Sequence, residues 1–151
     1  LIRMCGDFME MVVERVVEHP IDTVFDLIAD QTKTTQWCLA LTECKLTTDG
    51  AIDQGSKRVV SRKFLGVKLD WEFDLDAFER PRVMTWSTKK GKAPMVDTYT
   101  LEEAGSGTRI RHFIDTQPTG LLALLGPIAK AKGTEDMAKD LAALEGLLDA
   151  A

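Results

Sequence analysis

Apolar and charged residues alternate from Val67 to Asp76 in one segment near the middle of the chain, VKLDWEFDLDAF. The apolar positions are Val67, Leu69, Trp71, Phe73 and Leu75, and each is followed by a charged residue. A period of two residues is typical of a β-strand with one face buried and the other in water. Val67–Phe78 is therefore predicted to be a long strand whose inner face carries Trp71 and Phe73, two rings that either fill a core or line a cavity.

Similar patterns separated by glycine- and proline-containing turns predict six further strands. They are Met9–Val17, Thr42–Thr48, Lys57–Phe64, Val83–Lys89, Val96–Glu102 and Thr108–Thr116. From Thr42 onward the connections are short, and consecutive strands joined in this way must be antiparallel.

Two short helices are predicted after the first strand. Pro20 suits a helix start because its missing N–H is not needed there, and Asp22 in the first turn suits the helix dipole. Val24, Phe25, Leu27 and Ile28 then give this helix an apolar face, and Gln31–Trp37 is predicted to be the second short helix.

The last segment, Leu121–Ala151, is predicted to be a long helix. Gly126-Pro127 and Gly133 indicate a break or kink in its opening part, and Thr134 is a candidate cap for the continuation. Beyond it an apolar stripe repeats at spacings of four, three and four residues: Met137, Leu141, Leu144 and Leu148.

This order of elements predicts an α+β fold, because a run of strands stands beside segregated helices. A twisted sheet of about seven strands curls, and the last helix, ~10–12 Å across, is the one sizeable cover for its inner face. A curled sheet that grips a single helix leaves space beside the helix, so an internal cavity is expected.

Charge and composition exclude some classes of function. The chain has 151 residues, of which 44% are hydrophobic and 28% charged, with a net charge of -5. These values favour one globular domain, 9–151, with 1–8 as an N-terminal extension or a start that is not native. The basic runs Lys57-Arg58 with Arg62-Lys63 and Lys89-Lys90 with Lys92 are expected to be solvated strand ends and turns, so no nucleic-acid partner is expected.

Cysteine usage and hydropathy suggest a soluble cytoplasmic protein. Three cysteines, Cys5, Cys38 and Cys44, make an odd count without a disulfide framework, and they do not stand at a metal-ligand spacing. The apolar run Leu121–Leu125 is far too short for a membrane span. No metal and no cofactor are expected.

Four stretches together resemble a known family. They are VVERVVEHPIDTVFDLIAD followed by Trp37, GSKRVVSRKFLGVKLDWEF, FERPRVMTWS and LEEAGSGTRIRHFI. With the C-terminal helix, they make the chain resemble the START-like superfamily with the helix-grip fold, and specifically the bacterial polyketide cyclase/dehydrase-like (SRPBCC) proteins. The family includes lipid carriers, hormone-binding proteins, polyketide aromatases and cyclases, and quinone-binding chaperones. The resemblance implies a largely apolar cavity between the sheet and the long helix, and it specifies a fold rather than an activity.

Strand alternation nominates the residues that face this cavity. The candidates are Arg15, Trp71, Phe73, Trp86, Tyr99, Ile110, His112 and Ile114 on strands, and Met137 and Leu141 on the last helix. The direction of Trp86 is left open by the alternation. His112 between two inward isoleucines is the sharpest polar candidate, and Tyr99 offers a hydroxyl. Asp97 has the same parity, and Arg15 would suit a carboxylate head group. Each of these also has a simpler interpretation as core or edge packing.

Three functional hypotheses follow. The first is the binding or transport of a small hydrophobic molecule, such as a lipid, fatty acid, quinone or polyketide-like compound, without catalysis. The second is a polyketide aromatase or cyclase in which His112 or Tyr99 moves protons; no nucleophile triad or phosphate loop is recognisable. The third is a protein-interaction module whose cavity is filled by side chains.

Overall fold

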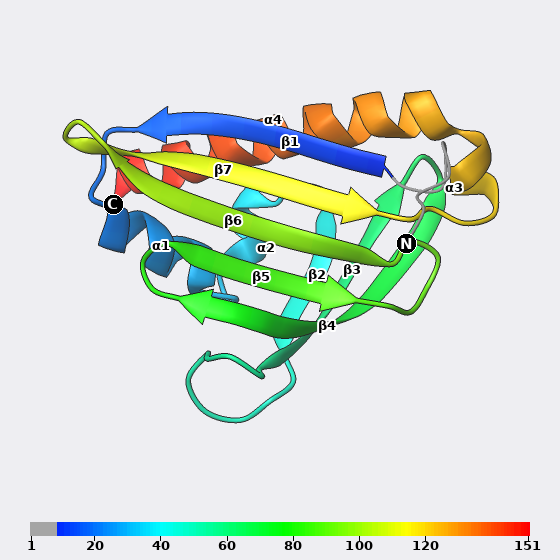
Figure 1. The fold of residues 1–151 in the computed structure, drawn as a ribbon, viewed down its shortest axis with the longest axis horizontal. Coiled ribbons are helices and arrows are strands. Elements are labelled where there is room, and N and C mark those ends of the chain that lie inside the picture. The colour runs from blue at the N-terminus through cyan, green and yellow to red at the C-terminus, as the bar shows by residue number, and fades with distance from the viewer. Residues whose placement is uncertain (1–8) are drawn as a thin grey trace.

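A single antiparallel sheet of seven strands dominates the computed structural model, which describes residues 9–151 (Figure 1). The strands lie in the order β1-β7-β6-β5-β4-β3-β2. Their bounds are β1 (Met9–Val17), β2 (Leu41–Leu46), β3 (Lys57–Phe64), β4 (Val67–Glu79), β5 (Val83–Thr88), β6 (Met95–Ala104) and β7 (Gly107–Thr116). The predicted strands are thus confirmed, with ends that differ by at most two residues. The expected extension, residues 1–8, lies outside the described part of the chain, as does Cys5.

The alternating segment forms β4, the longest strand, and its apolar positions face inward as predicted. Leu69, Trp71, Phe73 and Leu75 are all buried, and the acidic residues between them are exposed. In Figure 1, β2 and β3 cross steeply behind β6 and β7, which shows how strongly the sheet curls. This curvature creates the concave face on which the candidate residues lie.

Four helices cover the concave face and its ends. They are α1 (Ile21–Ala29), α2 (Thr34–Trp37), α3 (Leu121–Leu124) and α4 (Gly126–Ala150). The long helix α4 packs along β1 and against α2 (Figure 1). Its predicted apolar stripe, Met137, Leu141, Leu144 and Leu148, is buried throughout. The α+β helix-grip architecture is confirmed.

The predicted break in the last helix is confirmed at one position and wrong at the other. The chain leaves α3 at Leu125, and α4 begins at Gly126-Pro127. Gly133, in contrast, lies inside the continuous helix α4, where a Cβ would stand 2.6 Å from Sδ of Met11. Its small size permits close packing on β1. Thr134 is not a cap either, because its hydroxyl donates to the carbonyl of Lys130 within the helix.

No helix among residues 9–151 is both long enough and apolar enough to cross a lipid bilayer.

Candidate functional site

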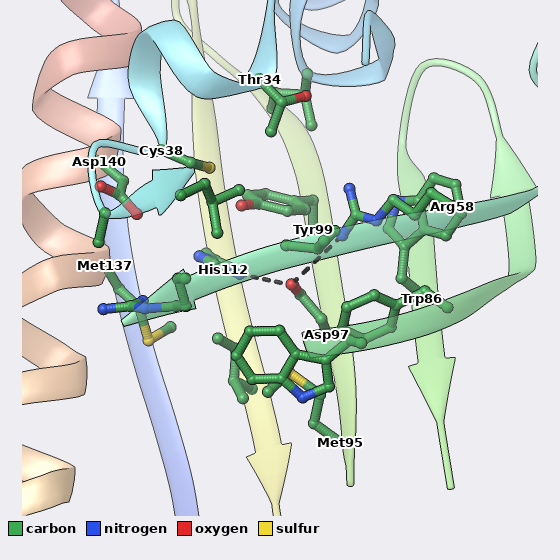
Figure 2. Close-up of a pocket in the computed structure, with 18 of the residues that line it drawn as sticks. Thr34, Cys38, Arg58, Trp86, Met95, Asp97, Tyr99, His112, Met137 and Asp140 are labelled. Atoms are coloured by element: carbon green, nitrogen blue, oxygen red, sulfur yellow. Dashed lines mark hydrogen bonds and ion pairs between the residues drawn. The ribbon is translucent and has the colours of Figure 1, made fainter. Parts of the chain in front are cut away.

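A cavity of about 100 Å³, here called the main cavity, lies between the concave face of the sheet, α2 and α4 (Figure 2). Seven of the predicted cavity residues line it: Trp71, Phe73, Trp86, Tyr99, His112, Ile114 and Met137. The alternation left the direction of Trp86 open; the structure buries it completely and turns it inward. For scale, a water molecule occupies ~30 Å³ in the liquid, and a cavity of ~150 Å³ holds benzene. The main cavity is real but small.

The remaining three predicted residues do not line the main cavity. Ile110 and Leu141 are 0% and 1% exposed and belong to the packed core. Arg15 faces α4 from β1, the edge strand, and its guanidinium binds the carboxylate of Glu145 at 2.8 Å. Arg15 therefore pairs with a carboxylate of α4 and not with the ligand head group that was expected.

A carboxylate and an imidazole from neighbouring strands form the polar centre of the cavity. Asp97 on β6 and His112 on β7 are diagonal cross-strand neighbours, and Oδ1 of Asp97 lies 2.7 Å from Nε2 of His112. Tyr99 stands directly opposite His112, and their rings stack with centroids 4.0 Å apart and an interplanar angle of 12°. Stacking and hydrogen bonding together fix the orientation of the imidazole.

The second ring nitrogen of His112 is left for another partner. An ionised carboxylate only accepts hydrogen bonds, so we assign the proton of this hydrogen bond to Nε2. Nδ1 is buried and has no hydrogen-bond partner among the residues that the structure describes. In Figure 2 the ring lies between Asp97 on one side and the helix carrying Met137 and Asp140 on the other. A buried nitrogen of this kind carries a free-energy cost that a ligand would relieve.

Arg58 is the main residue that sequence analysis missed. It was expected to be solvated, but it is 8% exposed and lines the main cavity. Its guanidinium donates to Oε1 of Gln31 at 2.8 Å, lies 4.0 Å from Asp97, and stacks over Trp86 with 4.1 Å to the ring centroid. The sequence pattern that could have predicted this burial is the alternation along β3, which places Arg58 on the same face as the buried Val60, two residues further along. Arginine is well suited to such a site because its guanidinium is planar, weakly hydrated and able to stack on aromatic rings.

Arg62 was also expected to be solvated, and this expectation is wrong as well. Arg62 lies on the same face of β3 as Arg58 and Val60. Its side chain is 16% exposed and reaches α4, where it binds Oδ2 of Asp136 at 2.8 Å. Lys132 binds the other oxygen of the same carboxylate at 2.7 Å. Burial disfavours the charge on Asp136, but hydrogen bonds from Lys132 and Arg62 outweigh it and hold the pKa of Asp136 below its usual value. This group anchors α4 to the sheet beside the cavity.

Asp140 is a further carboxyl group in the lining that was not foreseen. It accepts a hydrogen bond from the backbone N–H of Leu39 at 3.1 Å, which ties α4 to the segment after α2. Burial raises the pKa of Asp140 to about 6, and the Leu39 hydrogen bond offsets only part of that effect. Asp140 can therefore gain and lose a proton close to neutral pH.

The hydroxyl and thiol groups near the cavity are neutral. Burial raises the pKa of Tyr99 and that of Cys38 well above their usual values. Neither group is a ready nucleophile, because the thiolate or phenolate form is suppressed. Within residues 9–151 no group of three or more His, Cys, Asp or Glu side chains is arranged to hold a metal ion.

A second cavity of about 80 Å³ adjoins the main cavity on the side near α3. The two share walls made by Arg62, Trp71, Met95, Ile114 and Met137. Trp71 is fixed by its indole N–H, which donates to the carbonyl of Ala93 at 2.9 Å. Met95 and Met137 are unbranched, so they are the part of the partition that can change rotamer most easily.

The sequence matches a protein-family model described as polyketide cyclase / dehydrase and lipid transport, over residues 9–149. The chain belongs to this family. Among proteins with curated descriptions, none matches the sequence.

Solved structures show the family fold as well. A protein from Thermus thermophilus has a TM-score of 0.82 at 18% identity, covering 94% of this chain and 99% of its own. A START superfamily protein from Mycobacterium smegmatis has a TM-score of 0.76 at 15% identity and covers 94% and 97%. An aromatase/cyclase from a Streptomyces species has a TM-score of 0.76 at 15% identity and covers 94% of each chain. At these identities the likeness shows the START-like fold alone.

Proposed function

We propose that the protein binds a small, uncharged molecule with an apolar ring and a hydroxyl or carbonyl group in the main cavity. The observation that carries this proposal is the buried Nδ1 of His112, which lacks a partner in the described chain while Asp97 fixes the other side of the ring. Ligand pockets are mainly apolar with a few placed polar groups. The cavity around His112 has this composition.

The hydrogen-bond inventory supports a ligand that both donates and accepts. With the proton on Nε2, Nδ1 of His112 offers a lone pair, which suits a phenol or enol hydroxyl. The N–H groups Nε of Arg58 and Nε1 of Trp86 are buried without a partner among residues 9–151, and both residues line the cavity. These donors suit a carbonyl oxygen.

The charges around the cavity support a neutral ligand over a fatty acid. Arg58 already faces the carboxylate of Asp97 at 4.0 Å, and Asp140 adds a second carboxyl group to the lining. A ligand carboxylate would meet the carboxyl groups of Asp97 and Asp140, and the arginines of the lining, Arg58 and Arg62, already face the carboxylates of Asp97 and Asp136, so it would gain little.

The volume of the cavity supports a ring or a short chain. The main cavity of about 100 Å³ is smaller than the ~150 Å³ cavity that holds benzene, and the adjoining second cavity adds about 80 Å³. A rotamer change at Met137 or Met95 would open the partition to the second cavity and admit two fused rings. The family description, which covers polyketide and lipid ligands, agrees with an apolar guest.

Ring-matched probes test this proposal. Naphthalene, 1-naphthol and 1-naphthoate share one ring system but differ in polar group, so their dissociation constants separate shape from chemistry. We expect 1-naphthol to bind most tightly and to raise the melting temperature, because a ligand that binds only the folded state stabilises it. Equal affinity for all three, tighter binding of 1-naphthoate, or no binding of any would contradict the proposal.

A second candidate function is ring closure of a poly-keto chain, and the pairing of Asp97 with His112 beside Asp140 favours it. In this reaction Nδ1 of His112 removes a proton from a carbon between two carbonyls. The resulting carbanion forms a carbon–carbon bond to a ketone carbon of the same chain, whose oxygen takes up a proton. That oxygen takes its proton from the imidazolium of His112, which restores the base. The hydroxyl then leaves as water with a proton from protonated Asp140, while His112 accepts the proton lost from the adjacent carbon. The similar fold of the Streptomyces aromatase/cyclase supports this candidate.

Product analysis with a short synthetic polyketone tests the second function. Turnover should disappear in His112→Ala while the affinity for the uncyclised chain changes little. Unchanged product formation in that variant would eliminate the role of His112 as the base.

A further inference from the structure

Three large apolar side chains stand in water at one end of the molecule. Leu121, Leu124 and Ile128, on α3 and the first turn of α4, are 57%, 83% and 61% exposed. Leu121 and Leu124 stand three residues apart on α3, and Ile128 follows in the first turn of α4. A single exposed leucine requires no explanation, but neighbouring ones mark an interaction surface.

Six exposed lysines lie on segments at the same end of the molecule. Lys89, Lys90 and Lys92 come from the β5–β6 loop, Lys63 and Lys68 flank the β3–β4 turn, and Lys130 follows Ile128 on α4. Figure 1 shows this loop, this turn and α3 gathered at the same end of the fold. Hydrogen bonds join the segments directly, since Thr119 donates to the carbonyl of Lys92 and Nζ of Lys92 donates to the carbonyl of Lys68. We call this surface, Leu121, Leu124 and Ile128 with the six lysines, the α3 end.

The positive charge of the α3 end stands out against the chain as a whole, whose net charge is -5. Two carboxylates close to it have cationic partners. Asp70 lies 4.0 Å from Lys68, and Asp136 binds Arg62 and Lys132. Exposed apolar side chains with lysines on the neighbouring segments complement a surface that is apolar inside and anionic outside, which is the structure of an anionic lipid bilayer.

We propose that the α3 end docks on anionic membranes, with Leu121, Leu124 and Ile128 in the acyl boundary and the lysines at the lipid phosphates. The second cavity behind this surface favours a lipid bilayer over a protein as the partner. The second cavity lies directly beneath α3 and α4, where Leu122, Ala129 and Gly133 form part of its wall. An apolar molecule could pass from the bilayer to this cavity and on toward the main cavity without crossing water. The docking itself does not depend on what the main cavity binds.

Vesicle sedimentation with the full chain tests the docking. We expect binding to vesicles of phosphatidylcholine with about one-third phosphatidylglycerol, little binding to pure phosphatidylcholine, and weaker binding as salt rises, because exposed charges are screened. Leu124→Gln/Ile128→Gln should reduce the partition coefficient about 100-fold, at roughly tenfold for each buried side chain. Lys89→Gln/Lys90→Gln/Lys92→Gln should also reduce it about 100-fold.

Matched substitutions elsewhere on the surface serve as controls. Leu39 is 60% exposed on another part of the molecule, and Lys33, Lys45 and Lys139 are exposed lysines outside the α3 end. Leu39→Gln and the triple change of these lysines to Gln should leave vesicle binding within about threefold of the parent, because charges more than a Debye length from the bilayer are largely screened.

Several outcomes would overturn the proposal. They are no binding to anionic vesicles at low salt, equal binding to neutral vesicles, an equal loss in the control variants, and no loss in Leu124→Gln/Ile128→Gln. Light scattering tests the alternative that this surface binds a second copy of the chain. A dimer that Leu124→Gln/Ile128→Gln dissociates would also count against a membrane.

Discussion

Nε2 of His112 lies 2.7 Å from Oδ1 of Asp97, and Oδ2 of the same carboxylate lies 4.0 Å from the guanidinium of Arg58. All three residues are buried, so one carboxylate both orients the imidazole and balances the arginine. This sharing makes Asp97 the residue on which the polar centre of the cavity depends.

The coupling between Arg58 and Asp97 should be measurable in a double-mutant cycle. Asp97→Asn keeps the shape but leaves a buried cation without its counter-charge, and we expect a loss of roughly 2–4 kcal/mol in the free energy of unfolding. Arg58→Met/Asp97→Asn should be more stable than the sum of the two single changes predicts by at least ~1 kcal/mol. Urea denaturation measures each term. The exposed pair Arg109–Glu102, at 2.7 Å, is the control and should couple by less than ~1 kcal/mol. Additive effects at the buried pair would refute the coupling.

His112→Phe should separate the hydrogen bond of His112 from its packing. Phenylalanine keeps a ring that can stack on Tyr99 but has no Nδ1. We expect the affinity for 1-naphthol to fall about 3- to 10-fold, the range of one neutral hydrogen bond, while the affinity for naphthalene stays the same. Calorimetric titration measures both. His19→Phe, at a surface position paired with Asp149, should change neither affinity. A parallel loss for both probes would mean that His112 acts only through shape.

Asp140 should make the protein less stable as pH rises. Because its folded pKa is about 6 against 3.8 for the free side chain, the folded state binds more protons between these values, and the free energy of unfolding falls as pH rises through this window. Allowing for partial solvent screening, the effect should be ~1–2 kcal/mol. Asp140→Asn keeps an acceptor for Leu39 and should remove this slope, as measured by urea denaturation at pH 5 and pH 8.

The control for this pH dependence is a carboxylate with the opposite shift. A hydrogen bond from Arg80 lowers the pKa of Asp26, an exposed residue, so its contribution is present above its unfolded pKa and is lost as pH falls. Asp26→Asn should therefore leave the decline between pH 5 and pH 8 in place. If Asp140→Asn retains the parental slope, Asp140 is not its source.

Gly107 tests the junction between β1 and β7. A Cβ at this position would stand 2.2 Å from the carbonyl oxygen of Val17, a backbone atom that cannot rotate away. Gly107→Ala should therefore destabilise the protein by about 3 kcal/mol or more, at the upper end of single substitutions. At Gly126 a Cβ would meet no atom within 4 Å, so Gly126→Ala should change stability by less than ~1 kcal/mol. Thermal unfolding compares the two, and equal effects would contradict the packing.

Much of the fold and part of the site could be predicted because strand alternation is a local signal. The alternation along β4 predicted that Trp71 and Phe73 face inward. The same alternation along β6 and β7 predicted that Tyr99, Asp97 and His112 share one face. It could not reveal that Asp97 and His112 bond to each other, because this depends on the register between β6 and β7.

The charged residues were harder to predict because clusters of lysine and arginine are usually solvated. Arg58 and Arg62 share parity with Val60, but a buried arginine requires tertiary partners that no local pattern shows. Asp140 stands three residues after Met137, on the inner side of α4, and was missed for the same reason. Arg15 was placed on the correct face of β1, but its partner is Glu145 of the helix.

Nitrogen NMR of His112 tests the central claim most directly. The chain has two histidines, so protein labelled with ¹⁵N-histidine gives one site in the cavity and one surface reference, His19. Saturation with 1-naphthol should shift the Nδ1 resonance of His112 while both nitrogens of His19 stay in place, and naphthalene should leave Nδ1 unchanged. If 1-naphthol binds and the Nδ1 resonance of His112 does not move, the imidazole is not the ligand's partner and the account of this cavity is wrong.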